Sequence, residues 1–94
     1  VDMRNIPQIQ KYNVPIVLDA THSNQKPNQS SGKSGGTPDY IETLACAGVA
    51  AGANGVFIET HPNPKKALSD GSNMLALNLL EPLLKKLIAI KQVI

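Results

Sequence analysis

Two short apolar segments, each ending in polar residues, are the feature that most constrains the fold of this chain. Residues 14–20 read VPIVLDA and residues 55–60 read GVFIET. Continuous apolar runs of this length are typical of strands buried on both faces of a parallel sheet. Between them, Thr37 and Pro38 predict a helix N-cap and a first helical residue. The residues at helical spacing beyond them are Ile41, Leu44, Ala45, Gly48 and Val49. The pattern predicts a strand–helix–strand crossover.

Further elements are predicted on both sides of this crossover. Residues 1–3 are interpreted as the end of an earlier strand, and Asn5 as the cap of a short helix that reaches about Tyr12. Asn78 and Glu81 fit a capping box before a final helix. Its predicted buried stripe is Leu80, Leu84, Leu87 and Ile88, with Lys85, Lys86 and Lys91 facing outward. Strands that alternate with helices indicate an α/β fold with a parallel sheet, either open or part of a closed barrel.

Composition narrows the function classes. The chain has 94 residues, 41% of them hydrophobic, and a formal net charge of +2, as expected of an ordinary globular unit. Its nine Lys and Arg are scattered and its aromatic residues are two Tyr and one Phe, so nucleic-acid binding is not expected. Cys46 is the single cysteine, which fits a reducing compartment, and its apolar neighbours predict a buried small side chain.

The absence of recognisable targeting segments and the short chain length lead to two expectations, one about location and one about the size of the whole protein. We find no apolar run long enough to span a membrane and no signal-peptide layout at the start, so a cytoplasmic protein without membrane contact is predicted. Two strands and the end of a third cannot close a barrel, and an open sheet this narrow would leave apolar edges exposed. We therefore expect the chain to be one part of a longer protein.

Polar residues follow both predicted strands. His22 lies shortly after the first strand, Glu59 ends the second, and Asp70 lies in the loop after that. The carboxyl ends of parallel strands share one rim, where catalytic groups gather. One imidazole and two carboxylates suit a divalent metal of borderline character. Spacing alone leaves open the alternative that these are solvated loop residues.

A long loop separates the first strand from the crossover helix. It covers about residues 23–36, and its length favours an active-site cover that excludes water over a simple connector. A surface insertion is the alternative. The segment 32–34 reads GKS, but the first glycine and the strand–loop–helix context of a phosphate loop are missing, so nucleotide binding is rejected.

Five motifs in order resemble one enzyme family, the 3-deoxy-D-manno-octulosonate 8-phosphate synthases. The motifs are VDMRN at 1–5, DATHSNQ at 19–25, KSGG at 33–36, GVFIETHPNP at 55–64 and ALSDG at 67–71. The resemblance implies a (β/α)8 TIM barrel of roughly 250 residues. Residues 1–94 would be the C-terminal part of that single barrel domain, from the end of strand 6 to helix 8.

The resemblance also implies a reaction and its partners. Phosphoenolpyruvate condenses with D-arabinose 5-phosphate to give 3-deoxy-D-manno-octulosonate 8-phosphate and phosphate, a step of lipopolysaccharide biosynthesis. The implied assembly is a homotetramer.

Site residues carry over by position. His22, Glu59 and Asp70 match three metal ligands of the metal-dependent members, for Zn, Fe or Mn, and the fourth is a Cys outside this chain that metal-free members replace with Asn. Metal-free members usually have Cys-Asp-Gly-Pro where this chain has SDGS at 69–72, which favours the metal-dependent type. His22 and Asp70 are the implied catalytic residues, and Gln25 and Asp70 the implied substrate-binding residues. His61 is expected to support its loop.

Two alternatives stay open. The related 3-deoxy-7-phosphoheptulonate synthase, which uses erythrose 4-phosphate, shares the Glu-x-His-Pro and Ser-Asp-Gly motifs. The Asn-Gln at 24–25 and the KSGG segment favour the octulosonate enzyme, whereas TPD at 37–39 stands where many members carry an Arg. A non-catalytic flavodoxin-like binding module is the second alternative.

Overall fold

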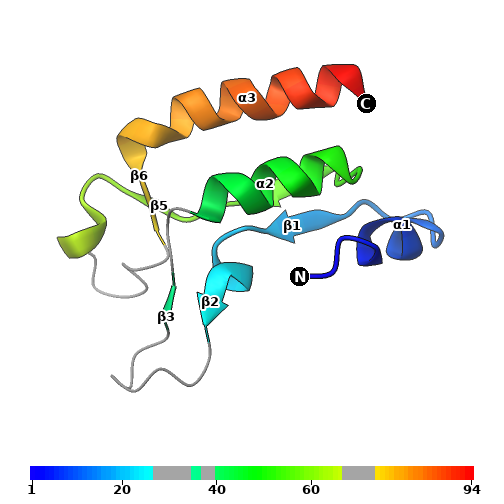
Figure 1. The fold of residues 1–94 in the computed structure, drawn as a ribbon, viewed down its shortest axis with the longest axis horizontal. Coiled ribbons are helices and arrows are strands. Elements are labelled where there is room, and N and C mark those ends of the chain that lie inside the picture. The colour runs from blue at the N-terminus through cyan, green and yellow to red at the C-terminus, as the bar shows by residue number, and fades with distance from the viewer. Residues whose placement is uncertain (27–34, 37–39, 67–73) are drawn as a thin grey trace.

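A parallel pair of strands joined by a helix forms the centre of the computed structural model, which describes residues 1–26, 35–36, 40–66 and 74–94. Strand β1 (Val17–Asp19) pairs with β4 (Gly55–Phe57) in parallel, with Leu18 opposite Val56. Helix α2 (Ile41–Ala50) lies between them in the sequence and beside them in space (Figure 1). The predicted strand–helix–strand crossover and the α/β class are confirmed. Thr37 and Pro38 lie outside the described residues.

The helices cover one face of this pair. Helix α2 packs directly on the strands and α3 (Leu80–Val93) lies along α2 (Figure 1). The approach of α2 is close at Gly48, where an added Cβ would lie 2.3 Å from Cδ2 of Leu18. The main core cluster consists of Ala20, Ile41, Ala45, Val49, Leu75, Leu83 and Leu87.

Short elements surround this centre. They are α1 (Asn5–Gln10), the 3₁₀ turns at His22–Asn24, Pro64–Lys66 and Leu77–Leu79, the antiparallel pair β2 (Gln25–Lys26) and β3 (Gly35–Gly36), and the parallel pair β5 (Thr60–His61) and β6 (Leu75–Ala76). The two small pairs lie beyond the carboxyl end of β1 and β4 (Figure 1).

Side-chain amides fasten the amino end of the strand pair. Oδ1 of Asn54 accepts the backbone N–H of Ile16 at 2.8 Å, and the backbone N–H of Asn54 donates to the Ile16 carbonyl at 2.8 Å. Nε2 of Gln10, at the end of α1, donates to the carbonyl of Gly52 at 2.7 Å and lies 3.3 Å from Oδ1 of Asn54. Gly52 has a φ of 107°, which favours glycine at this tight turn. These bonds attach α1 to the turn between α2 and β4.

The strands differ from the prediction in length and burial. The first was expected at 14–20 and the second at 55–60, but β1 and β4 have three residues each, and Thr60 belongs to β5 instead. Residues 1–3 form no strand. Burial on both faces is also wrong for this chain, because Val17 is 62% exposed and Phe57 is 47% exposed. No element of the described chain covers the face that carries them.

The predicted caps and the predicted helix stripe need correction. Neither α1 nor α3 has a side-chain cap bond, and their N-cap residues are Arg4 and Leu79 rather than Asn5 and Asn78. The 3₁₀ turn at Leu77–Leu79 enters α3 directly and leaves Asn78 within that turn. The buried residues of α3 are Leu83 and Leu87. Leu84 and Ile88, predicted as core, are exposed because α3 faces α2 along the Leu83 side.

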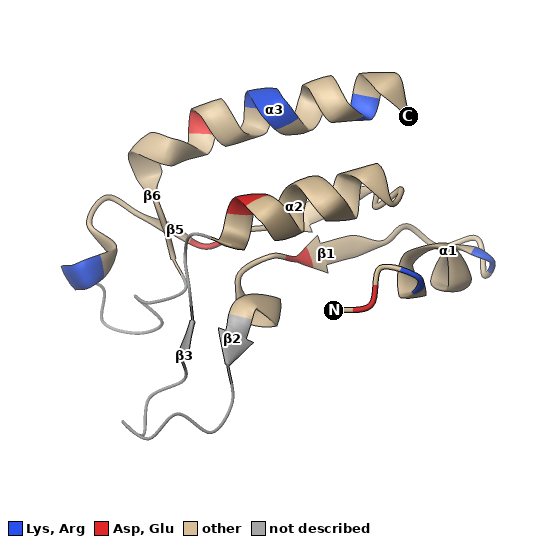
Figure 2. Cartoon of the chain, in the orientation of Figure 1, with Lys and Arg blue, Asp and Glu red and all other residues tan. Residues whose placement is uncertain are grey.

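Charged residues are distributed over several elements (Figure 2). On α3, Lys85 forms an ion pair with Glu81 one turn earlier, with Nζ and Oε1 3.2 Å apart. Lys86 bonds to Glu42 of α2 and joins the two helices at their surface. Among the described residues, no helix has the length and apolar character needed to cross a membrane.

Candidate metal centre

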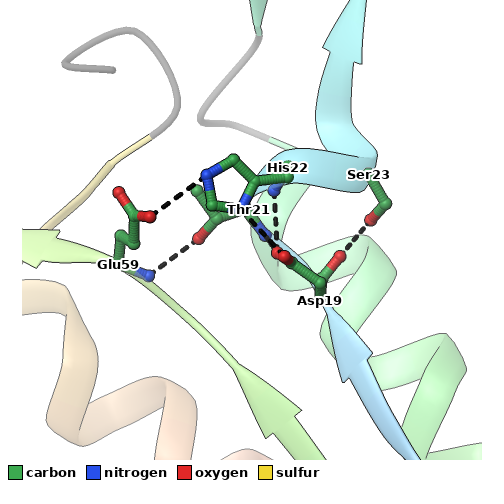
Figure 3. A network of polar contacts seen from close by, with 5 residues as sticks. All are labelled: Asp19, Thr21, His22, Ser23 and Glu59. Atoms are coloured by element: carbon green, nitrogen blue, oxygen red, sulfur yellow. Dashed lines mark hydrogen bonds and ion pairs between the residues drawn. The ribbon is translucent and has the colours of Figure 1, made fainter. Parts of the chain in front are cut away.

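His22 is held by Asp19 at the carboxyl end of β1 (Figure 3). Oδ1 of Asp19 accepts the backbone N–H of Thr21 at 2.9 Å and that of His22 at 2.8 Å. Oδ2 of the same carboxylate lies 2.8 Å from Nδ1 of the His22 ring. The hydroxyl of Ser23 donates to the Asp19 carbonyl. The chain therefore turns sharply after the strand, and the imidazole is tied at one nitrogen.

The hydrogen bonds around Asp19 lower the pKa of its carboxyl group. Burial, the largest single influence, raises its pKa, but the hydrogen bonds from the His22 backbone, the His22 ring and the Thr21 backbone together outweigh burial. The net result is a pKa below the usual value. An ionised carboxylate only accepts hydrogen bonds, so Nδ1 of His22 is the donor in this pair.

Glu59 is held through its backbone just beyond β4. Its N–H donates to Oγ1 of Thr21 at 2.7 Å, and its carbonyl accepts the N–H of Leu75 at 2.9 Å. Thr21 itself is fully buried. The hydroxyl of Thr21 therefore fixes the Glu59 backbone against the end of β1, although 38 residues separate the two positions.

The side chains of His22 and Glu59 meet at this point. Nε2 of His22 lies 3.1 Å from Oε1 of Glu59, and the Glu59 side chain is 26% exposed (Figure 3). The His22 and Phe57 rings have centroids 6.1 Å apart and an interplanar angle of 34°. His22 thus has an acidic side chain at each ring nitrogen, Asp19 at Nδ1 and Glu59 at Nε2.

This arrangement fits a divalent metal. With a metal bound, a ring that keeps its proton on Nδ1 would present the Nε2 lone pair to a cation that it shares with the Glu59 carboxylate. Two donors at about 2.0–2.2 Å from one tetrahedral metal lie about 3.4 Å apart, so the observed 3.1 Å would widen slightly around a bound ion. Metal-bound histidines commonly donate their other N–H to a carboxylate, which is the role that Asp19 fills.

The structure brings together two of the three predicted ligands, His22 and Glu59. Asp70 lies outside the described residues. The described part of the chain contains no group of three or more His, Cys, Asp or Glu side chains that could hold a metal. Gln25 begins β2 directly after the turn that carries His22, but its side chain also lies outside the description.

The predicted active-site cover starts and ends at the β2–β3 pair. Gln25 lies opposite Gly36 and Lys26 opposite Gly35, so this antiparallel pair joins the two ends of the loop. Residues 27–34, which carry most of that loop, lie outside the described part. Its role as a cover stays a prediction.

Two other predicted residues are placed clearly. Nδ1 of His61 accepts the backbone N–H of Asn63 at 2.9 Å, so this histidine supports its own loop, as predicted. Cys46 lies in α2 and packs against the main core cluster in a half-buried position. Burial, followed by the negative charge of Glu42, raises its pKa, although Lys86 acts in the opposite direction.

Asp19 and Thr21 are the site residues that the sequence-based prediction missed. Their signal was an acidic residue and a hydroxyl at the end of an apolar strand, three positions and one position before the histidine. Such residues commonly accept backbone N–H groups one to three residues further on. Their separate links to a histidine and to a distant glutamate depend on strand pairing, which the local sequence does not specify.

Known proteins resemble this chain along its whole length. The model of the DAHP synthetase I family matches residues 1–94. A 2-dehydro-3-deoxyphosphooctonate aldolase of Syntrophobacter fumaroxidans is 50% identical over 94 residues, which is 100% of this chain and 33% of the relative. The protein of that name from Nitratidesulfovibrio vulgaris is 52% identical over 90 residues, 96% of this chain and 33% of the relative. The chain thus spans about a third of the length of these curated relatives.

A solved structure is similar as well. The phospho-2-dehydro-3-deoxyheptonate aldolase (DAHP synthase) of Thermotoga maritima superposes with a TM-score of 0.81 at 33% identity. The match covers 99% of this chain and 24% of that one.

Proposed function

Because this chain belongs to the DAHP synthetase I family, we propose that it is part of an enzyme that condenses phosphoenolpyruvate with D-arabinose 5-phosphate. The product is 3-deoxy-D-manno-octulosonate 8-phosphate, for lipopolysaccharide biosynthesis. Relatives named 2-dehydro-3-deoxyphosphooctonate aldolase at about 50% identity support this choice. The observation that carries it is the contact between Nε2 of His22 and Oε1 of Glu59 at the carboxyl end of two parallel strands.

In this proposal the chain is the C-terminal part of a (β/α)8 barrel, from the end of strand 6 to helix 8. The outer edges of β1 and β4 pair with no other strand among the described residues. The uncovered face carries Val17 and Phe57, and barrel interiors are filled by such side chains from alternate strand positions. Six further strands would cover both edges and this face. We also propose a cytoplasmic homotetramer.

His22, Glu59 and Asp70 are the proposed metal ligands within this chain. Residues 62–74 are the connection between β5 and β6. The N–H of Leu75, which begins β6, donates to the Glu59 carbonyl. Asp70 is five positions before Leu75, and five extended residues span at most about 18 Å. The sequence separation is therefore compatible with Asp70 as a third ligand beside the pair. The Zn, Fe or Mn ion and the fourth ligand outside this chain complete the proposed centre.

The reaction places clear demands on these residues. C3 of phosphoenolpyruvate forms a bond to the aldehyde carbon of the sugar, whose oxygen takes up a proton. Water adds to C2, and the C2–O bond to phosphate breaks, releasing inorganic phosphate. A bound divalent metal supplies a Lewis acid that orients reactants and polarises oxygen. We propose that His22 is held in a fixed position beside the reacting groups and that Asp70 contacts the sugar hydroxyls. Gln25 is proposed to orient the water.

The related enzyme that uses erythrose 4-phosphate is the second candidate, because the Thermotoga maritima heptulosonate enzyme has the same local fold. Assays of the complete protein with phosphoenolpyruvate and each sugar phosphate distinguish them. We expect phosphate release with arabinose 5-phosphate, loss of activity after verified metal removal, and recovery when the metal is returned. Activity with erythrose 4-phosphate alone would support the second candidate. No release with either sugar would leave the binding-module alternative.

A further inference from the structure

We propose that Asp19 and Thr21 are positioning residues that set His22 and Glu59 as a matched pair of ligands. Asp19 fixes the imidazole through Nδ1, and Thr21 fixes the backbone of the carboxylate that faces Nε2. The inference rests on the proposed metal-dependent function.

Asp19 controls both the place and the orientation of His22. One carboxylate oxygen accepts the backbone N–H of His22 at 2.8 Å, which fixes where its side chain leaves the chain. The other oxygen lies 2.8 Å from Nδ1, which fixes the ring rotation and keeps the ring proton on Nδ1. The remaining nitrogen, Nε2, is thereby directed at Glu59.

Thr21 performs the corresponding task for Glu59. The regular ladder extends to the bond from the Ala20 N–H to the Phe57 carbonyl, and beyond it the Thr21 hydroxyl accepts the N–H of Glu59 at 2.7 Å. The fully buried Thr21 side chain cannot move without disturbing its surroundings. Its own N–H is bonded to Asp19. The two positioning residues therefore form one connected unit.

The different side-chain partners of Asp19 and Thr21 still allow the two ligands to be tested one at a time. Loss of the Asp19 carboxylate releases the His22 ring and its tautomer while the bond from Glu59 to Thr21 persists. Loss of the Thr21 hydroxyl removes one of the two backbone bonds that hold Glu59, while the ring stays bonded to Asp19. A merely structural role would lower stability in both variants but would leave the ring tautomer and the metal affinity unchanged.

The test uses the complete protein with Asp19→Asn and Thr21→Val. Asparagine offers one acceptor oxygen in place of two, so either the turn or the ring bond is lost. Valine matches threonine in shape without the hydroxyl. Matched controls are Glu42→Gln and Thr43→Val, both at exposed positions of α2. Zinc affinity is measured by competition with a chelator, and the His22 ring is followed by ¹⁵N–¹H correlation in the zinc-loaded protein.

We expect Asp19→Asn to lower zinc affinity by about 10–100-fold, as other losses of partners behind a metal-bound histidine do. It should also weaken or shift the Nδ1–H signal of His22. Thr21→Val should lower zinc affinity without changing that signal, and both controls should match the wild type. The wild-type spectrum is itself a test that needs no variant, because a His22 ring without a proton on Nδ1 would overturn the inference.

Failure of this inference differs from failure of the proposed function. If His22→Ala loses zinc while Asp19→Asn and Thr21→Val bind it as the wild type does, the positioning role is wrong and the metal site stands. If His22→Ala binds zinc as tightly as the wild type, the proposed metal site itself is wrong.

Discussion

The two ends of the β1–β4 pair are fastened by different chemistry. At the amino end, the neutral amides of Gln10 and Asn54 bond almost entirely to backbone groups. At the carboxyl end, the ionisable side chains of Asp19, His22 and Glu59 contact one another. Both ends join segments about 40 positions apart, since Gln10 reaches Gly52 and Thr21 reaches Glu59. The amino end therefore holds the strands together, whereas the carboxyl end also places two possible metal-ligating atoms, Nε2 of His22 and Oε1 of Glu59, next to each other.

This division follows from how parallel strands are built. Connections between them meet at both ends, but catalytic groups of barrel enzymes collect at the carboxyl end and the opposite end serves stability. The comparison yields a rule for this molecule: substitutions at the amino end should change stability, and substitutions at the carboxyl end should change metal binding and turnover.

The largest expected effect is that of His22→Ala in the complete protein. Removal of a direct ligand should lower metal content and reduce turnover by at least about 100-fold, or about 2.7 kcal/mol of activation free energy. The thermal unfolding midpoint of the metal-free protein should change little, because the exposed ring lies outside the core. Metal analysis, steady-state kinetics and calorimetry provide the three measurements. Unchanged metal content would contradict the division between the ends.

The sequence predicted the parts of this division that depend on local pattern. The crossover, and the placement of His22 and Glu59 at one rim, followed from two apolar runs with polar ends and were correct. The predicted strand lengths were wrong. In the α3 stripe, Leu87 is buried and Leu80 packs against the core as predicted, but Leu84 and Ile88 are exposed, because they match a helical period as well as Leu83 does. Which side of α3 is buried depends on the angle at which it meets α2, and that is decided by packing.

The amino-end bonds escaped prediction for a related reason. Asn54 was part of a turn before a strand, and nothing in its neighbours indicates that its side chain accepts the N–H of Ile16, 38 positions earlier. Such a bond exists only after β1 and β4 have paired. Tertiary hydrogen bonds of this kind are consequences of the register and cannot be read from spacing.

The second expected effect is that of Asn54→Ala at the amino end. It leaves the N–H of Ile16 without its side-chain acceptor and also removes a partner of Gln10. We expect a loss of about 1–3 kcal/mol in the free energy of unfolding, with metal affinity unchanged. Asn54→Asp, which keeps an acceptor oxygen in place, is the matched control and should lose less. A variant with normal stability and weakened metal binding would reverse the proposed roles of the two ends.

A smaller effect is expected for Gln10→Ala. Its Nε2 bond to the Gly52 carbonyl is one half-buried hydrogen bond, so the loss should be about 0.5–1.5 kcal/mol. Gln8→Ala, an exposed position on the same short helix, is the control. Urea titration of both variants compares them directly. Equal stability of the two would mean that α1 is not attached through Gln10.

The smallest effect concerns Cys46, which lies on α2 between the two ends and can report on each. Burial, and then Glu42, raise the pKa of this thiol, so less of the reactive thiolate is present at a given pH than in an ordinary cysteine. Iodoacetamide should therefore modify Cys46 more slowly in the folded protein than in urea, with the rate rising only at a higher pH, as followed by peptide mass spectrometry. Asn54→Ala should speed the reaction by loosening the end of α2 that leads to β4, and His22→Ala should not. Equal acceleration by both variants would show that the two ends are mechanically coupled through α2. The strand pair and α2 would then behave as one cooperative unit, without separate roles for the two ends.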